Sequence, residues 1–406
     1  MVPMPKSRGR RRKPHRTLSD VHRLDAGSSR ARALAEFPIL QATDAAEARG
    51  DARAALRIIE RDQLRRGDEN FWRPGKVERL GLLNALGPLL PRWATSRWIL
   101  AQALQWLDQW SRARTARALE IAIAARGGEA ALLGGDELDA RVKVIDHDWV
   151  FRQTFLYELG GLQHFVSRVA SADLLAGADG IHDWARTPMG AFRLVGESAL
   201  SLTWSDLATD QEIESLNLGA ASLLQPGECA IGRLVAVAEG AMFESAPLAV
   251  PDEVAQQVAE APSEWVGIVS AACRERRWTD EPILTDHGHD FRLLTDVPLA
   301  MQQIVAVLAF ERTTGRRAPL DSGAVLSVEH CLLRAALDDR LEDVLPGCSP
   351  FPSVAATLLD PLVIRRLRDV LAPSDSSKLE RLGALLAGPA SDLCLALARD
   401  LATAAV

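Results

Sequence analysis

The spacing of apolar residues changes twice along this chain of 406 residues. In residues 45–66, Ala48, Ala52, Ala55 and Ile59 recur at three- and four-residue intervals, as they would on one face of a helix. Similar patterns predict helices over most of residues 34–185 and 251–406. The chain is therefore expected to hold two helical domains with these bounds.

Part of the first helical domain resembles a known repeat. Gly50 and Asp51, followed by Ala54, Ala55 and Leu56, resemble the second helix of a tetratricopeptide-type repeat, where small residues allow close helix packing. The resemblance covers about one helix. It implies a repeat-like packing of helices in residues 34–185.

Residues 190–250 follow a different period. Leu200, Leu202 and Trp204 alternate with smaller or polar residues, which places the large side chains on one face of a strand. Turn formers at 206–211 and 225–228 divide this stretch into about five short strands. That number suits a small closed or half-open barrel of the SH3 or OB type.

A second β element is predicted at residues 281–296, where two apolar runs flank the polar turn 286–290. The fold class expected from these patterns is mainly α, within the α+β class. The protein should be multi-helical, with a small antiparallel β-barrel-like insert at 190–250 and a separate β-hairpin inside the helical domain at 251–406.

Charge is distributed unevenly along the chain. Residues 1–33 hold ten Lys and Arg but two Asp, a net charge of +8, while the whole chain carries −7 and residues 34–406 therefore −15. Pro3, Pro5 and Pro14 and the lack of an apolar period predict a disordered tail, which we call the basic arm. Such an arm can neutralise phosphates and bind nucleic acid. The candidate nucleic-acid-binding residues are Arg8, Arg10, Arg11, Arg12, Lys13 and Arg16.

Two other interpretations of the basic arm stay open. It can fold back on the acidic remainder of the chain, or it can be an extension without a function of its own.

The five cysteines show no paired spacing, which is typical of a reducing cytoplasm. No apolar run approaches the length of about 20 residues that a membrane span needs. We therefore expect a cytoplasmic protein that does not cross a membrane.

Histidine–aspartate doublets are the main candidates for chemistry, beginning at His147, His182 and His289. Adjacent His and Asp can both ligate a metal on a helical scaffold, and in this respect the doublets resemble those of the all-helical HD phosphohydrolases. That resemblance covers two residues, since no histidine between His22 and His147 supplies the earlier ligand.

The run 286–290 offers a second arrangement, in which His and Asp side chains converge on one ion. The other interpretation is a polar hairpin turn, with Gly288 at the position that needs a positive φ. The candidate metal ligands are His147, Asp148, Asp286, His287, His289 and Asp290.

Motifs of nucleophilic catalysis, phosphate-binding loops and dinucleotide binding do not occur in the sequence. We therefore expect a non-enzymatic interaction or regulatory protein without a cofactor. Its helices would form a scaffold for a protein partner, and its basic arm would contact nucleic acid or an acidic partner. The alternatives are a metal-dependent hydrolase using the His–Asp doublets, and a β insert that binds a peptide by strand addition.

Overall fold

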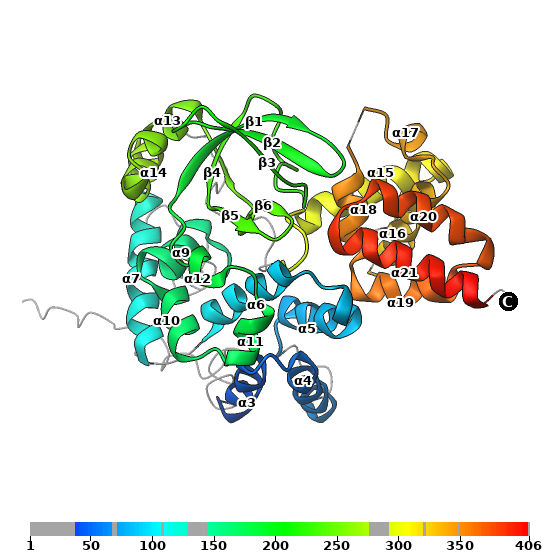
Figure 1. Ribbon diagram of the computed structural model, residues 1–406, viewed down its shortest axis with the longest axis horizontal. Coiled ribbons are helices and arrows are strands. Elements are labelled where there is room, and N and C mark those ends of the chain that lie inside the picture. The colour runs from blue at the N-terminus through cyan, green and yellow to red at the C-terminus, as the bar shows by residue number, and fades with distance from the viewer. Residues whose placement is uncertain are drawn as a thin grey trace, which may run out of the picture.

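A computed structural model describes residues 37–66, 71–106, 109–128, 141, 144–275, 292–319, 322–347 and 349–404. Helices precede and follow a central antiparallel sheet (Figure 1). The expectation of a mainly α protein with a small antiparallel sheet is confirmed. In the part of the chain that the structure describes, no helix has the length and apolar character that crossing a membrane requires.

The helices that precede the sheet pack beneath it (Figure 1). They are α3 (Phe37–Ala48), α4 (Ala52–Arg66), α5 (Pro74–Leu86), η1 (Gly87–Leu89), α6 (Arg92–Gln105), α7 (Gln109–Ala125), α9 (Trp149–Gln153), η3 (Thr154–Glu158), α10 (Gly161–Arg168), α11 (Ala172–Gly177) and α12 (Ile181–Trp184).

The helix expected over residues 45–66 is divided in two. Gly50 has φ +81°, and the chain turns there between α3 and α4. Asp51 then caps α4, because its Oδ1 accepts a hydrogen bond from the Ala54 backbone N–H at 2.8 Å. Both helices keep their apolar faces, with Ala55 and Ile59 fully buried.

The central sheet has five strands in the order β3-β2-β1-β4-β7, and all its neighbouring strands are antiparallel. A separate two-stranded sheet, β5-β6, lies beside it. The strands are β1 (Gly190–Glu197), β2 (Ser201–Asp206), β3 (Glu212–Leu216), β4 (Cys229–Gly232), β5 (Leu234–Val237), β6 (Gly240–Phe243) and β7 (Leu248–Val250).

The expectation of a barrel-like insert needs correction, because residues 190–250 do not form a closed barrel. Closure requires every strand to be paired on both sides, but β3 and β7 are edge strands and β5 pairs with β6 alone. The last strand, β7, has three residues and ends before Pro251, which lacks the N–H that further pairing would use.

The alternation expected for Leu200, Leu202 and Trp204 holds within β2 but not at Leu200, which precedes the strand and is 46% exposed. Leu202 and Trp204 are fully buried between the sheet and the β5-β6 hairpin, in a small core that also contains Phe192 and Phe243. Trp204 and Phe243 meet edge to face, with ring centroids 5.0 Å apart.

The helices after the sheet fill the rest of the molecule, with α13 and α14 beside the sheet and α15 to α21 in a separate group of helices (Figure 1). They are α13 (Asp252–Glu260), η4 (Pro262–Glu264), α14 (Trp265–Arg274), α15 (Leu299–Thr314), α16 (Ser322–Leu337), α17 (Leu341–Val344), α18 (Phe351–Leu358), α19 (Pro361–Val370), η5 (Pro373–Asp375), α20 (Ser376–Leu385) and α21 (Gly388–Ala404).

Most of the β-hairpin expected at 281–296 lies outside the described residues, and its described end, residues 292–296, is not a strand. Among the described residues, β5 and β6 form a two-stranded sheet separate from the central one, at residues 234–243.

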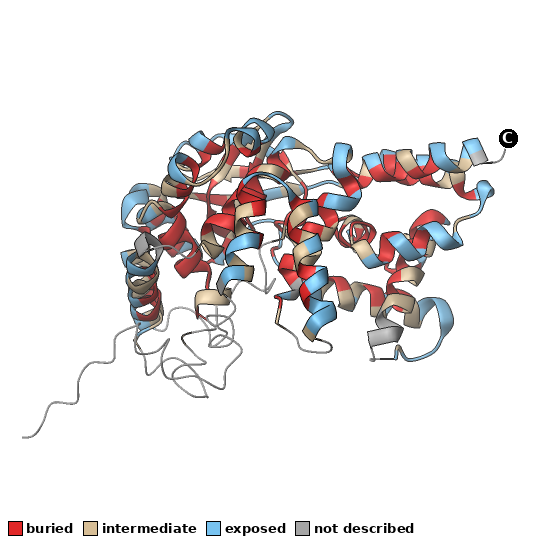
Figure 2. Ribbon diagram, turned by 90° about the horizontal axis from the view of Figure 1, so that it is seen from below, coloured by how far each residue is buried: buried red, intermediate tan, exposed pale blue. Residues whose placement is uncertain are grey.

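A large core of buried apolar side chains extends from Ala46 to Ala398, through the helices and one face of the sheet. In Figure 2, buried stretches occur on helices and strands throughout the described part of the molecule. The proposed division into an arm, two helical domains and an insert stays a prediction.

Candidate functional site

Three buried arginines lie where the helices meet the sheet and the chain before α15. Arg97 on α6, Arg152 on α9 and Arg233 between β4 and β5 expose 0%, 7% and 4% of their surface. A guanidinium keeps its charge in a protein interior, so each must be balanced by acceptors.

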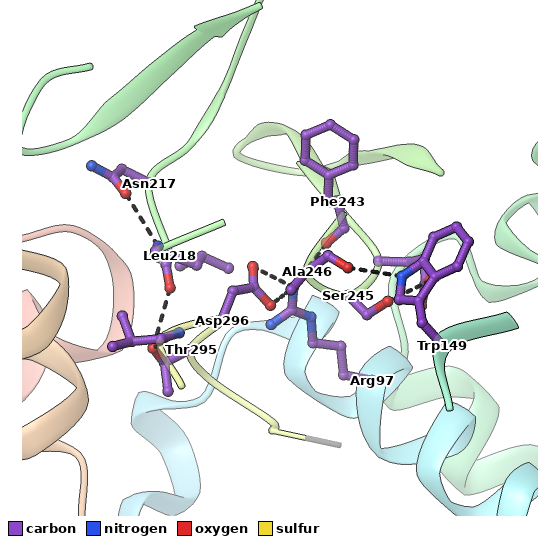
Figure 3. Close-up of polar contacts among 12 residues, drawn as sticks. Arg97, Trp149, Asn217, Leu218, Phe243, Ser245, Ala246, Thr295 and Asp296 are labelled. Atoms are coloured by element: carbon purple, nitrogen blue, oxygen red, sulfur yellow. Dashed lines mark hydrogen bonds and ion pairs between the residues drawn. The ribbon is translucent and has the colours of Figure 1, made fainter. Parts of the chain in front are cut away.

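Arg97 joins three distant parts of the chain (Figure 3). Its Nη2 donates to the carbonyl oxygen of Phe243 at 2.8 Å and lies 3.0 Å from Oδ1 of Asp296. The guanidinium also lies 5.6 Å from the ring centroid of Trp93, at the distance of a cation–π contact. Burial raises the pKa of the Asp296 carboxyl, and the neighbouring Arg97 opposes that shift.

The residues around this ion pair are also held by hydrogen bonds (Figure 3). The carbonyl oxygen of Leu218 accepts from the Asp296 backbone N–H at 2.7 Å and from Thr295 Oγ1 at 3.1 Å. Trp149 Nε1 donates to the carbonyl oxygen of Ala246 at 3.1 Å. The loops after β3 and β6 are therefore tied to the helices and to the chain before α15.

Arg233 makes a second set of contacts beside the first. Its Nη2 lies 2.6 Å from Glu158 Oε1, its Nε donates to Gln153 Oε1 at 2.9 Å, and its Nη1 donates to the carbonyl oxygen of Thr187. The guanidinium also lies over the ring of Tyr157, 4.2 Å from its centroid.

Tyr157 and Glu158 come from a π-helical turn, η3. The i→i+5 hydrogen bond of this turn runs from the Leu159 N–H to the Thr154 carbonyl oxygen at 2.9 Å. Single π-turns occur often at functional sites because they shift side chains out of the regular helical register. Here the turn presents both side chains to Arg233.

Glu244 links the two sets of contacts. Its Oε1 accepts from Gln153 Nε2 at 2.5 Å and from Ser245 Oγ at 2.7 Å. Burial, and next the charge of Glu244, hold the pKa of Tyr157 well above its ordinary value, so the phenol stays protonated at neutral pH.

We call five buried side chains and the more exposed Glu158 the buried charge network: Arg97, Arg152, Arg233, Glu244 and Asp296, with Glu158 38% exposed. Arg152 belongs to it because its charge acts on Asp296 and Tyr157. Three positive and three negative charges balance one another. Its composition suits a junction that fixes the helices, the sheet and the later segment in one arrangement.

Some polar atoms of the network lack partners among the residues that the structure describes. They are Nε and Nη1 of Arg97 and Oε2 of Glu244, each almost without accessible surface. An unpaired buried polar atom costs about 1–3 kcal/mol, so the network does not maximise stability at every atom.

A small pocket lies beside this junction, between the sheet and the C-terminal helices. Leu218, Leu294, Phe351 and Leu386 are among its mostly apolar lining residues. The lining residue Asn217 is already engaged, since its Nδ2 donates to the Ser198 carbonyl oxygen at 2.7 Å. The pocket therefore presents few polar groups that could orient a substrate.

The structure gives Asp148 a role of its own. Oδ1 accepts from the Phe151 N–H at 2.7 Å as the N-cap of α9, and Oδ2 lies 2.5 Å from Arg126 Nη2. Both carboxylate oxygens are therefore engaged. Burial raises the pKa of Asp148 to about 6, and Arg126 opposes the shift.

The described residues bring no metal site together. Within the described ranges, no group of three or more His, Cys, Asp or Glu side chains could hold an ion. His182 and Asp183 are exposed on α12. The other candidate ligands, Asp286, His287, His289 and Asp290, lie outside the described residues, so the metal hypothesis stays a prediction.

The candidate nucleic-acid-binding residues of the basic arm, Arg8 to Arg16, also lie outside the described residues. The six residues of the buried charge network were not predicted from the sequence. One available signal was Arg97, which lies between Trp93 and Trp98 on the same helix. Another was Tyr157, the single tyrosine of the chain.

Comparisons with known proteins place this chain in no family. No family model matches it, and neither the curated proteins nor the solved structures contain a significant match.

Proposed function

We propose that this chain is a non-enzymatic interaction protein whose basic arm binds nucleic acid and whose folded part serves as a scaffold for a protein partner. The observation that carries the proposal is the separation of charge, +8 on residues 1–33 against −15 on residues 34–406. An acidic body repels phosphates, so contact with nucleic acid is directed to the arm.

The folded part supports this proposal by its chemistry. Its charge network ties separate segments of the chain together, as a rigid scaffold requires. Its small pocket is mainly apolar.

The test is the binding of fluorescent random-sequence duplex DNA and single-stranded RNA by the full chain, followed by anisotropy at 50 and 200 mM salt. Six arm contacts predict a log–log salt slope of roughly −5 for the duplex, a loss of about 10³ in affinity over this range. Replacing Arg8, Arg10, Arg11, Arg12, Lys13 and Arg16 by Gln should abolish this salt-dependent binding.

A matched variant controls for the loss of six positive charges. It carries Gln at six exposed arginines of the C-terminal helices and their preceding loops: Arg316, Arg317, Arg365, Arg366, Arg368 and Arg381. The control should bind the duplex as the unmodified chain does. Equal binding by the arm variant and the unmodified chain would refute the role of the arm.

A further inference from the structure

The sheet and the helix that follows it carry most of the negative charge of the folded part. Residues 190–264 contain twelve Asp and Glu, two Arg and no Lys, a net charge of −10 out of the −15 on residues 34–406. Ten of these carboxylates are exposed. Both arginines are engaged: Arg193 lies 3.1 Å from Asp252, and Arg233 is buried in the charge network. This part of the surface therefore holds negative charge without cations of its own.

One face of the sheet displays part of this charge on regular strands. In the β2–β3 register Ser205 lies opposite Glu212 and Thr203 opposite Glu214, so these four side chains share a face. The alternate residues Leu202 and Trp204 point the other way, into the small core.

Helix α13 covers only part of this same face. Arg193 lies opposite Ser205 across the β1–β2 pair, and its side chain meets Asp252 at the start of α13. On the β2 and β3 side of the face, Leu216 is partly buried against the large core, whereas Ser201, Thr203, Ser205, Glu212 and Glu214 are polar and at least partly exposed. The part of the sheet face around Glu212 and Glu214 is therefore polar and exposed.

We call the carboxylates of this area the acidic sheet face, defined by Asp210, Glu212 and Glu214. Asp210 lies in the turn between β2 and β3 and is exposed, like both glutamates. None of the three forms an ion pair with a residue that the structure describes. Their charges are available to a cationic segment.

We propose that the acidic sheet face holds the basic arm of the same chain, residues 1–33, and that nucleic acid competes with this face for the arm. Charge complementarity favours this occupant: the arm carries +8, and the region containing the face carries −10. The docking of the arm does not depend on the proposed function, whereas the competition rests on the proposed nucleic-acid binding.

The length of the arm allows this contact. In Figure 1, α3, where the described chain begins, lies at the bottom of the molecule, and the sheet lies at the top. A chain of 33 residues spans up to about 110 Å when fully extended. Because both partners belong to one chain, docking occurs at an effective concentration in the millimolar range, so weak ion pairs suffice.

Arginine suits these carboxylates because its planar guanidinium can bind a carboxylate with two N–H donors. Exposed pairs contribute about 0.2–1 kcal/mol each, so three pairs change the docking equilibrium constant by roughly 3- to 160-fold. Salt screens exposed pairs, and docking should therefore weaken strongly between 50 and 500 mM salt.

The test is the rate at which trypsin cleaves the arm of the full-length protein under limiting protease, read by mass spectrometry. Asp210→Asn, Glu212→Gln and Glu214→Gln together should raise that rate at least about threefold at 50 mM salt. Salt at 500 mM should bring the unmodified chain to the rate of the variant.

The matched control removes three exposed carboxylates of the C-terminal helices, Asp369, Glu380 and Asp392, as the corresponding amides. It should cleave at the unmodified rate. Thermal unfolding of all three proteins checks that the exposed substitutions leave the fold intact. Equal cleavage rates for the sheet-face variant and the unmodified chain at low salt would overturn the docking.

Duplex DNA binding at 50 mM salt then separates the two proposals. If the arm binds DNA and docks on the sheet face, the sheet-face variant binds DNA more tightly than the control by a factor close to the change in cleavage rate. Faster cleavage without any DNA binding supports the docking and refutes the proposed function. Arm-dependent DNA binding with unchanged affinity in the variant overturns the competition alone.

Discussion

The contact of Arg97 with Asp296 illustrates how much depends on single residues in this interior. Asp296→Ala would leave a fully buried guanidinium with the Phe243 carbonyl oxygen as its remaining hydrogen-bond acceptor. Loss of one partner of a buried pair costs about 3–5 kcal/mol, and we expect that loss in the free energy of unfolding by urea. Asp252→Ala, which removes the partner of the exposed Arg193, should cost about 1 kcal/mol or less. Similar losses in both variants would contradict the role given to the buried pair.

Glu329 on α16 makes the stability depend on pH. Burial, and next repulsion by Asp360 and Glu78, raise its pKa from the ordinary 4.5 to about 7, against the opposing charge of Arg292. The folded state therefore binds a proton more tightly than the unfolded state. The resulting stability is fully present below pH 4.5 and is lost as the pH rises through 7.

Glu329→Gln keeps the shape of the side chain without the charge. We expect the variant to exceed the unmodified protein in unfolding free energy by up to about 3 kcal/mol at pH 8. The difference should shrink as the pH falls towards 5. Urea titrations at a series of pH values measure this, and a difference that is constant with pH would argue against a titrating Glu329.

At the scale of elements, the turn between α3 and α4 depends on a backbone conformation that suits glycine. Gly50 has φ +81°, and a Cβ there would lie 3.6 Å from Leu174, an ordinary contact. Gly50→Ala should therefore cost about 1–2 kcal/mol through backbone strain alone. Gly267 lies within α14, and a Cβ added there would have no neighbour within 4 Å. Gly267→Ala should therefore stabilise the folded protein by about 0.5–1 kcal/mol. In thermal unfolding, we expect a lower melting temperature for Gly50→Ala and a higher one for Gly267→Ala than for the unmodified protein.

At the scale of the whole molecule, the continuous core and the buried charge network predict one cooperative unfolding transition for residues 37–404. All ten tryptophans lie between Trp72 and Trp278, whereas helices continue to Ala404. Tryptophan fluorescence thus reports the sheet and the helices up to α14, and far-ultraviolet circular dichroism reports every helix. The two urea transitions should coincide, and a separate dichroism transition would show that the C-terminal helices unfold independently.

Local patterns predicted much of the secondary structure because the period of apolar residues reflects one face of one element. Leu202 and Trp204 are buried on a strand as their alternation indicated, and Ile59 is buried on a helix. The closure of the sheet was predicted wrongly, because closure depends on which strands pair. The β5-β6 hairpin packs over Trp204 and does not join the central sheet, an arrangement that no local period encodes.

The buried charge network could not be predicted for a related reason. Arg97 contacts Phe243 and Asp296, which lie 146 and 199 residues further along the chain. An arginine on a helix is usually solvated. Its burial becomes favourable only when the fold places acceptors from distant residues within hydrogen-bonding distance of its guanidinium.

The sequence by itself determined the mainly helical character, the antiparallel strands at the centre and the opposite charges of the arm and the remainder. These properties depend on residue order and composition, which are local or additive. Only the tertiary structure decided that the sheet stays open, that Asp148 caps α9 and pairs with Arg126, and that Glu212 and Glu214 share a face with Thr203 and Ser205. Each of these depends on distances between residues, which the fold alone establishes.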